Sequence, residues 1–111
     1  MQQIIGPDAR WMITSDGERR DLARYGPARR LLDRLVEHRL AHPGCAISAD
    51  ALIEVGWPNE KMRHTAALLR VYSAIRRLRR LGLDRVLITR DDGYLLDPDA
   101  EIVRGETRRA A

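Results

Sequence analysis

The sequence predicts an α+β fold in which a small antiparallel sheet precedes three helices and a C-terminal β-hairpin. Two observations predict it: short β-favouring runs between turn residues lie near both ends, and apolar residues recur at helical spacing in the middle. The chain has 111 residues, of which 44% are hydrophobic, which suits one compact core. We expect one domain over residues 1–103 and a flexible tail over residues 104–111.

The N-terminal segment is expected to form the sheet. Residues 3–5 and 10–14 are rich in β-favouring side chains, and the Gly-Pro-Asp sequence at 6–8 favours a turn between them. Residues 19–22 follow a second turn at 15–18 and are expected to form a third strand. A meander of antiparallel strands is the simplest arrangement of these runs.

Two helices are expected next. Residues 28–41 contain no helix breaker before Pro43, and leucines and Val36 recur among them at helical spacing. Ser48 is a suitable N-cap for a second, shorter helix that ends at Val55. We expect the apolar side of each helix to face the core.

The third helix, expected over residues 66–81 with Thr65 as its cap, has two chemically different faces. Successive residues turn by about 100°, and this spacing gathers one apolar face, which we expect to be buried: Ala67, Leu68, Val71, Ile75 and Leu78. The opposite face is polar: Arg70, Ser73, Arg76, Arg77 and Arg80. Arg79 falls off this outer face.

The last regular elements are the two strands of a hairpin. Residues 85–90 form a β-favouring run, and the Asp-Asp-Gly sequence at 91–93 favours a tight turn. Residues 94–96 return as the second strand before Asp97 and Pro98.

Basic charge is concentrated in and just before the third helix. The chain has a formal net charge of +4, yet residues 61–83 hold seven Lys and Arg and no Asp or Glu. A local patch of this kind indicates a polyanionic partner more strongly than a diffuse excess does. The alternative interpretation is an ordinary solvated face in an arginine-rich chain.

This order of elements, with a basic amphipathic third helix before a hairpin, is that of a winged helix-turn-helix. A helix fits the major groove of B-form DNA, where arginine bonds guanine edges or phosphate oxygens. The predicted function is therefore sequence-specific binding of double-stranded DNA for transcriptional regulation. Because one such domain buries little surface on DNA, a second copy of the chain or a partner protein is expected to take part.

Several short motifs follow one another in a defined order. They are Leu52 and Trp57, then Val71 and Ile75, then Arg-Leu-Arg-Arg at 77–80, Ile-Thr-Arg at 88–90 and Gly-Tyr-Leu at 93–95. In their order and spacing the chain resembles, over residues 4–97, the DNA-binding output domain of OmpR/PhoB-type bacterial response regulators. The resemblance implies a winged helix-turn-helix that contacts DNA through exposed positions of its third helix.

The candidate DNA-binding residues lie on the third helix, at its entrance and in the hairpin. The resemblance implies contact by the exposed helix positions, while Arg63 and His64 at the entrance are expected to bind phosphate. Arg90 is the candidate in the hairpin. The full set is Arg63, His64, Arg70, Ser73, Arg76, Arg77, Arg80 and Arg90.

Three features depart from that family. We expect a stand-alone domain without a receiver domain, and therefore no phosphorylatable aspartate. Asp91 and Asp92 place two carboxylates at the hairpin tip, where they would repel phosphate, and Pro58 stands where the family usually has glycine. The acidic tip and the missing sensor favour an alternative function, a winged-helix protein-interaction or assembly module that does not read DNA sequence.

Other classes of protein have little support in the sequence. It contains no nucleotide-binding loop, nucleophile–base pair or HExxH motif, so we expect neither enzymatic activity nor a cofactor. His38, His42 and Cys45 lack the further ligands that a metal site requires. We find no membrane-spanning run, no secretory signal and a single cysteine, and therefore expect a cytoplasmic protein that does not bind membranes.

Overall fold

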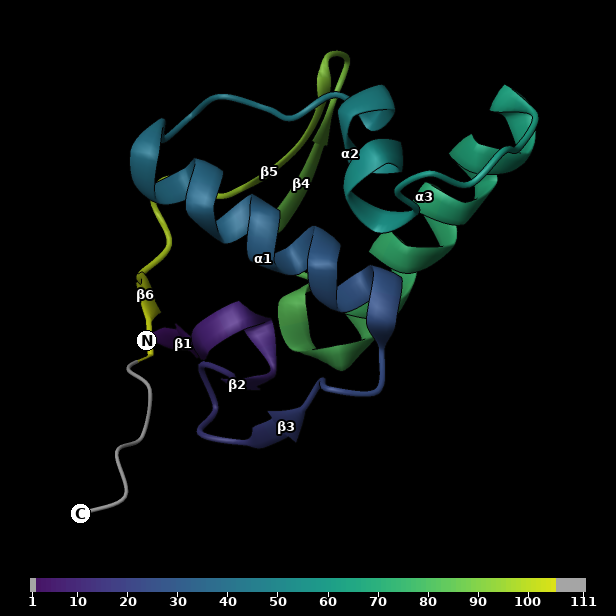
Figure 1. Ribbon diagram of the computed structural model, residues 1–111. Coiled ribbons are helices and arrows are strands. Elements are labelled where there is room, and N and C mark those ends of the chain that lie inside the picture. The colour runs from purple at the N-terminus through teal and green to yellow at the C-terminus, as the bar shows by residue number, and fades with distance from the viewer. Residues whose placement is uncertain (1, 106–111) are drawn as a thin grey trace.

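The computed structural model describes residues 2–105, which form three α-helices and two sheets (Figure 1). The helices are α1 (Gly26–Ala41), α2 (Ala49–Gly56) and α3 (His64–Leu78). The strands are β1 (Gln3–Ile5), β2 (Trp11–Ile13), β3 (Arg19–Asp21), β4 (Leu87–Arg90), β5 (Gly93–Leu96) and β6 (Ile102–Arg104). Two short helical turns complete the list, η1 (Pro7–Ala9) and η2 (Arg79–Leu83). The expectation of an α+β fold is confirmed.

The larger sheet contains the expected meander and one further strand. Its order is β3-β2-β1-β6, with β1 antiparallel to β2 and parallel to β6, so that Gln3 lies opposite Ile102. The sequence analysis did not foresee β6. Its partner lies at the other end of the chain, and a run of three residues carries too little pattern to predict such a long-range pairing.

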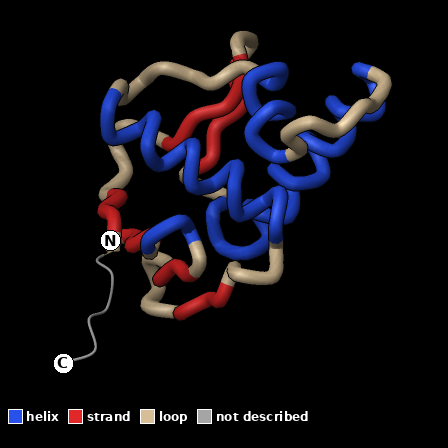
Figure 2. Tube along the Cα trace, in the orientation of Figure 1, coloured by secondary structure: helices blue, strands red, loops and turns tan. Residues whose placement is uncertain are grey.

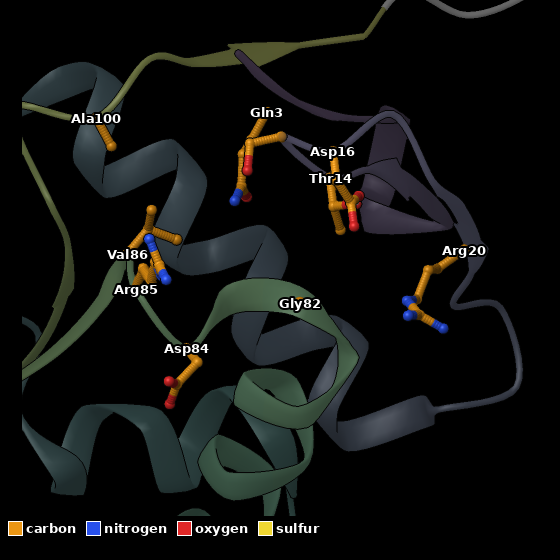
Figure 3. Close-up of a pocket in the computed structure, with 10 residues that line it drawn as sticks. Gln3, Thr14, Asp16, Arg20, Gly82, Asp84, Arg85, Val86 and Ala100 are labelled. Atoms are coloured by element: carbon orange, nitrogen blue, oxygen red, sulfur yellow. The ribbon is translucent and has the colours of Figure 1, made fainter. Parts of the chain in front are cut away.

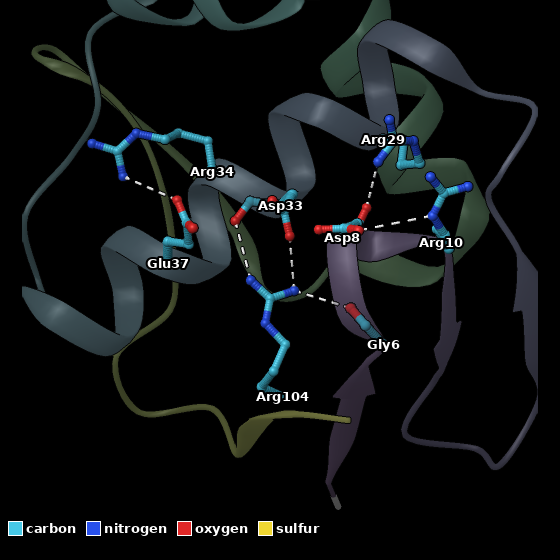
Figure 4. A network of polar contacts seen from close by, with 8 residues as sticks. All are labelled: Gly6, Asp8, Arg10, Arg29, Asp33, Arg34, Glu37 and Arg104. Carbon is cyan, nitrogen blue, oxygen red and sulfur yellow. Dashed lines mark hydrogen bonds and ion pairs between the residues drawn. The ribbon is translucent and has the colours of Figure 1, made fainter. Parts of the chain in front are cut away.

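Arg104, which the sequence analysis assigned to a flexible tail, is the last residue of β6 and fastens this strand to α1. Its Nη1 lies 2.9 Å from Asp33 Oδ1 and donates a hydrogen bond of 3.0 Å to the carbonyl oxygen of Gly6 (Figure 4). The Arg104 and Asp33 side chains are only 27% and 26% exposed. Gly105, also assigned to that tail, donates a backbone hydrogen bond of 2.6 Å to the Ile5 carbonyl oxygen, and residues 106–111 lie outside the described residues.

The core is built around α1, which runs between the two sheets (Figure 2). The fully buried residues of α1 are Leu31, Leu32, Leu35 and Val36. They are joined by Leu52 of α2, by Leu22 before α1, and by Leu96 of the hairpin. The apolar periodicity of α1 therefore marks its buried side, as expected, except at Leu40, which is 49% exposed because it lies in the last turn of the helix, beyond the core. Within residues 2–105, no helix is both long and apolar enough to cross a membrane.

The N-cap of α2 lies where the sequence predicts it, whereas the N-cap of α3 does not. The Ser48 side chain accepts a hydrogen bond of 3.1 Å from the Ala51 N–H, so the expected N-cap of α2 is confirmed. The expectation that Thr65 caps α3 is wrong, because the extended residue before the helix is Arg63, whose side chain makes no capping bond. The α-helical part of α3 ends at Leu78, and η2 continues the helical path until Gly82, whose φ of 129° is not helical.

The hairpin of β4 and β5 is attached to the helical part through backbone hydrogen bonds. The expected hairpin is present, but its turn contains only residues 91 and 92, because Gly93 pairs with Arg90 as the first residue of β5. Ile47, just before α2, exchanges hydrogen bonds of 2.8 and 2.9 Å with Tyr94. Gly93 has a φ of 141°, and a Cβ atom there would lie 2.0 Å from the Ile47 carbonyl oxygen. Only glycine permits this close approach.

Candidate nucleic-acid interface

The expected division of α3 into a buried and an exposed face is confirmed. The buried residues are Ala67, Val71, Ala74, Ile75 and Leu78, while Leu68 is half-buried. The side chains expected on the opposite face are all exposed: Arg70, Ser73, Arg76, Arg77 and Arg80. The helix packs its apolar side against α1 and α2 and leaves the other side open (Figure 1).

The exposed cations of the C-terminal half of α3 have no acidic partner. Within residues 2–105, no carboxylate lies within ion-pair distance of Arg76, Arg77 or Arg80. Two of these guanidinium groups lie over aromatic rings instead. That of Arg76 is 5.8 Å from the ring centroid of Tyr72, and that of Arg77 is 5.4 Å from the ring centroid of Tyr25. These contacts orient the cations without neutralising them.

The pKa of Tyr25 also reports positive charge near this end of the site. A hydrogen bond of 3.5 Å from Arg24, together with the charge of Arg24, lowers the pKa of the Tyr25 hydroxyl, and Arg77 lowers it further. Tyr25 and Arg77 line the same groove of about 230 Å³ between the start of α1 and α3. The basic character of α3 thus continues onto the neighbouring end of α1.

The N-terminal half of α3 is different, because folding brings two carboxylates to it. Glu60 Oε1 lies 3.2 Å from Arg70 Nη1, and Asp50 Oδ1 of α2 lies 2.6 Å from His64 Nε2. Residues 61–83 contain no acidic side chain, but carboxylates from elsewhere in the chain therefore lie beside this half of the helix. Two candidate residues, His64 and Arg70, are paired with carboxylates, and the unpaired charge of the helix lies towards its C-terminus.

Arg63 and Arg79, at the two ends of α3, have contrasting environments. The exposed Arg63 side chain has no hydrogen-bond or ion-pair partner among residues 2–105. Arg79 turns away from the exposed face, as expected, and donates hydrogen bonds of 2.8 Å to the Leu87 carbonyl oxygen and to Thr89 Oγ1. Arg79 therefore ties the end of α3 to β4 rather than adding to the candidate interface.

At the hairpin tip, the candidate cation Arg90 is paired with a neighbouring carboxylate. Arg90 Nε lies 3.3 Å from Asp92 Oδ1, and Arg90 Nη2 lies 3.4 Å from Asp92 Oδ2. The candidate cation and one of the two tip carboxylates thus pair with each other. A groove of about 390 Å³ separates the tip from the start of α3, and it is lined by Asp50, Asp91 and Asp92 among others.

A second hollow, of about 470 Å³, lies between the larger sheet and η2 (Figure 3). Its lining combines carboxylates with arginines: Asp16, Arg20, Asp84 and Arg85. This mixture of charges gives it no preference for an anion.

His38 and His42, which the sequence analysis weighed as metal ligands, have ring centroids 5.4 Å apart. Among the described residues, no group of three His, Cys, Asp or Glu side chains is placed to hold a metal ion.

Two large apolar residues share the exposed face of α3, and the sequence analysis missed both. Leu69 is 66% exposed and Tyr72 is 51% exposed. The signal was available in the sequence, because Leu69 precedes the buried Leu78 by nine residues and so lies about 180° around the helix from it. A projection of every α3 residue would have placed Leu69 at the centre of the polar face.

No protein-family model, curated protein or solved structure matches this chain.

Proposed function

We propose that this chain is a winged helix-turn-helix domain that binds double-stranded DNA sequence-specifically and serves transcriptional regulation. The observation that carries this proposal is the group of exposed arginines Arg76 and Arg77 on α3 and Arg80 on the adjoining turn η2, which have no ion-pair partner among residues 2–105. Three further features support it: α2 packs beside α3, the hairpin of β4 and β5 follows α3 in the chain, and α3 leaves one full side open (Figure 1).

The dimensions of α3 suit the major groove. An α-helix with its side chains is about 10–12 Å across, and the major groove of B-form DNA is about 12 Å wide. Arg76 and Arg80 are four residues apart, and so lie about one turn from each other on the same side of the helix. In the groove, such side chains bond guanine O6 and N7, while Arg77 and Arg63 at the margins of the face bind phosphate oxygens.

The hairpin is expected to contribute less to DNA binding than its sequence predicts. The pairing of Arg90 with Asp92 reduces the charge that Arg90 offers to a phosphate. Asp91 adds an exposed carboxylate at the same tip. Binding therefore depends mainly on α3, and a second copy of the chain or a partner protein supplies the remaining contact area.

The direct test is a salt titration of binding to a random-sequence duplex. We expect Arg76→Ala combined with Arg80→Ala to weaken binding at low salt. On a random-sequence duplex these side chains contact phosphates instead of a preferred guanine. The magnitude of the slope of log K against log salt should therefore also fall by about 1 to 2, since each lost phosphate contact lowers it by roughly 0.9. A matched control removes the same charge elsewhere. Arg10 and Arg34 each pair weakly with a carboxylate, at 3.9 and 4.0 Å, and belong to the segment before β2 and to α1 (Figure 4).

The proposal fails if the wild-type chain does not bind duplex DNA at low salt. It also fails if the double variant on α3 and the control variant, Arg10→Ala with Arg34→Ala, lose the same amount of affinity. In that case net charge alone, rather than the face of α3, would account for the binding.

One observation favours a second candidate, a winged-helix protein-interaction module. Asp50, Asp91 and Asp92 line the groove beside the start of α3, and their charge repels a phosphate backbone that passes there. Such a module would retain a stoichiometric protein partner after nuclease treatment of a lysate. A partner that is lost together with the nucleic acid would count against it.

A further inference from the structure

We infer that Leu69, at the centre of the exposed face of α3, reads the 5-methyl group of thymine in the major groove. This inference rests on the proposed function and adds the base that the helix prefers. It starts from an apolar side chain whose position in the fold has no structural explanation.

Leu69 makes no contribution to the hydrophobic core. Its side chain is 66% exposed, and it lies about 180° around the helix from the buried Leu78. Ser73, Arg76 and Arg80 follow it at four, seven and eleven residues, which places all of them on one stripe along the helix. Leu69 is thus the apolar member of an otherwise polar stripe.

Tyr72 extends the apolar surface at Leu69 and orients a cation beside it. Tyr72 is 51% exposed, and the Arg76 guanidinium lies over its ring at 5.8 Å from the centroid. One side of the ring is therefore covered, whereas the Leu69 side chain stays free. The resulting surface is apolar at Leu69 and Tyr72, and the cations Arg76 and Arg80 follow on the C-terminal side of them.

A partner that fits this surface must be anionic where it meets Arg76 and Arg80 and apolar at one point beside them. The major groove meets both conditions, because phosphates line its two sides and the thymine methyl is the apolar group on its floor. Guanine presents two hydrogen-bond acceptors in the major groove, O6 and N7, which suit the arginines further along the helix. We therefore expect a site in which an A·T pair faces Leu69 and a G·C pair faces Arg76 or Arg80.

The experiment begins with selection of the duplex that the wild-type chain binds most tightly from a random library. Each thymine of that duplex is then replaced by deoxyuridine, which preserves base pairing and removes only the methyl group. We expect one such replacement to weaken binding about fourfold, the value for one buried methyl-sized group. Replacements outside the contacted position should leave affinity unchanged.

A variant of Leu69 tests whether this residue is the one that contacts the methyl group. Leu69→Ala should weaken binding to the thymine duplex by about fourfold or more, and it should bind the thymine and deoxyuridine duplexes equally. Leu40→Ala is the matched control, because Leu40 is an exposed leucine of α1, with 49% of its surface accessible. It should retain the full difference between the two duplexes. Unchanged thermal midpoints for both variants would show that neither perturbs the fold.

The outcomes separate this inference from the proposed function. If no duplex is selected, the proposed function fails, and this inference with it. If a duplex is selected but every deoxyuridine replacement is neutral, the proposed function stands and the thymine inference is overturned. The inference is also overturned if Leu69→Ala keeps the preference for thymine, since another residue would then read the methyl group.

Discussion

Neighbouring arginines at the end of α3 have different environments, and this difference predicts different effects of their removal. Arg79 donates hydrogen bonds to the Leu87 carbonyl oxygen and to Thr89, whereas Arg80 is exposed with no such partner among residues 2–105. Arg79→Ala should lower the free energy of unfolding by about 1–2 kcal/mol, because the Leu87 carbonyl oxygen loses its charged donor. Arg80→Ala should leave that free energy nearly unchanged and weaken DNA binding. Urea denaturation and a binding titration of the two variants measure both effects, and equal loss of stability in both would contradict this assignment.

The environment of His38 predicts how stability depends on pH. Burial lowers the pKa of His38 from its ordinary value of 6.5, and the charges of Arg34 and His42 lower it further. The unfolded chain therefore binds a proton at His38 more readily than the folded protein does. The contribution of His38 to stability is fully present above about pH 6.5 and is lost as the pH falls towards the lowered pKa.

His38→Gln removes this titrating group and tests the prediction. Urea midpoints of the wild type and the variant, measured between about pH 7.5 and 5, should converge towards acid pH because only the wild type loses the His38 contribution. All other side chains are the same in the two proteins, so the difference between the two curves isolates His38. Curves that stay parallel across this range would show that the pKa of His38 is not lowered in the folded protein.

At the scale of elements, the attachment of the hairpin to the segment before α2 depends on Gly93. Alanine at this position would combine an unfavourable φ of 141° with a Cβ atom 2.0 Å from the Ile47 carbonyl oxygen. Gly17 provides the control, since its φ is 86° but a Cβ atom there has nothing within 4 Å. We expect Gly17→Ala to cost about 1 kcal/mol of stability and Gly93→Ala about 3 kcal/mol or more. Equal costs, measured by thermal unfolding, would exclude a role for the contact with Ile47.

The ion pair at the hairpin tip gives a second prediction at this scale. Asp92→Asn removes one carboxylate and releases Arg90 from it, so duplex affinity at low salt should rise severalfold. Asp99→Asn removes the same charge from the exposed loop after β5 and should have a smaller effect. Affinities measured at low and high salt compare the two variants. A larger gain from Asp99→Asn would mean that the tip lies far from the bound DNA.

The elements that could be predicted from the sequence are those with local signals. The periodicity of α1 and α3, the Ser48 cap and the Asp-Asp-Gly turn each depend on residues close together in the chain. β6 could not be predicted, because its pairing with β1 joins the two ends of the described chain. The carboxylate partners of His64 and Arg70 were missed for the same reason, since Asp50 and Glu60 approach α3 only in three dimensions. Leu69 was predictable and was overlooked, because a leucine in a helix is usually buried.

At the scale of the whole molecule, the half-buried ion pair of Arg104 with Asp33 holds the C-terminal strand to the central helix. Asp33→Ala should lower the free energy of unfolding by about 1–2 kcal/mol, because it leaves the Arg104 guanidinium largely enclosed with only carbonyl oxygens as partners. Glu37→Ala is the control, since Glu37 pairs with Arg34 at 4.0 Å in an exposed position and should cost under about 0.5 kcal/mol. Equal losses in urea denaturation would show that the pair of Arg104 with Asp33 contributes no more to stability than an exposed ion pair does.

The parallel pairing of β1 with β6 also determines how the molecule can be handled and joined to others. Both ends of the described chain meet in the larger sheet, on the side of the molecule away from α3 (Figure 1). A fluorescent dye or a sensor-surface linker coupled near Gln2 therefore leaves the exposed face of α3 accessible to solution. A second folded domain fused at this end would likewise leave that face clear, whereas an insertion in the loop between α2 and α3 would obstruct it.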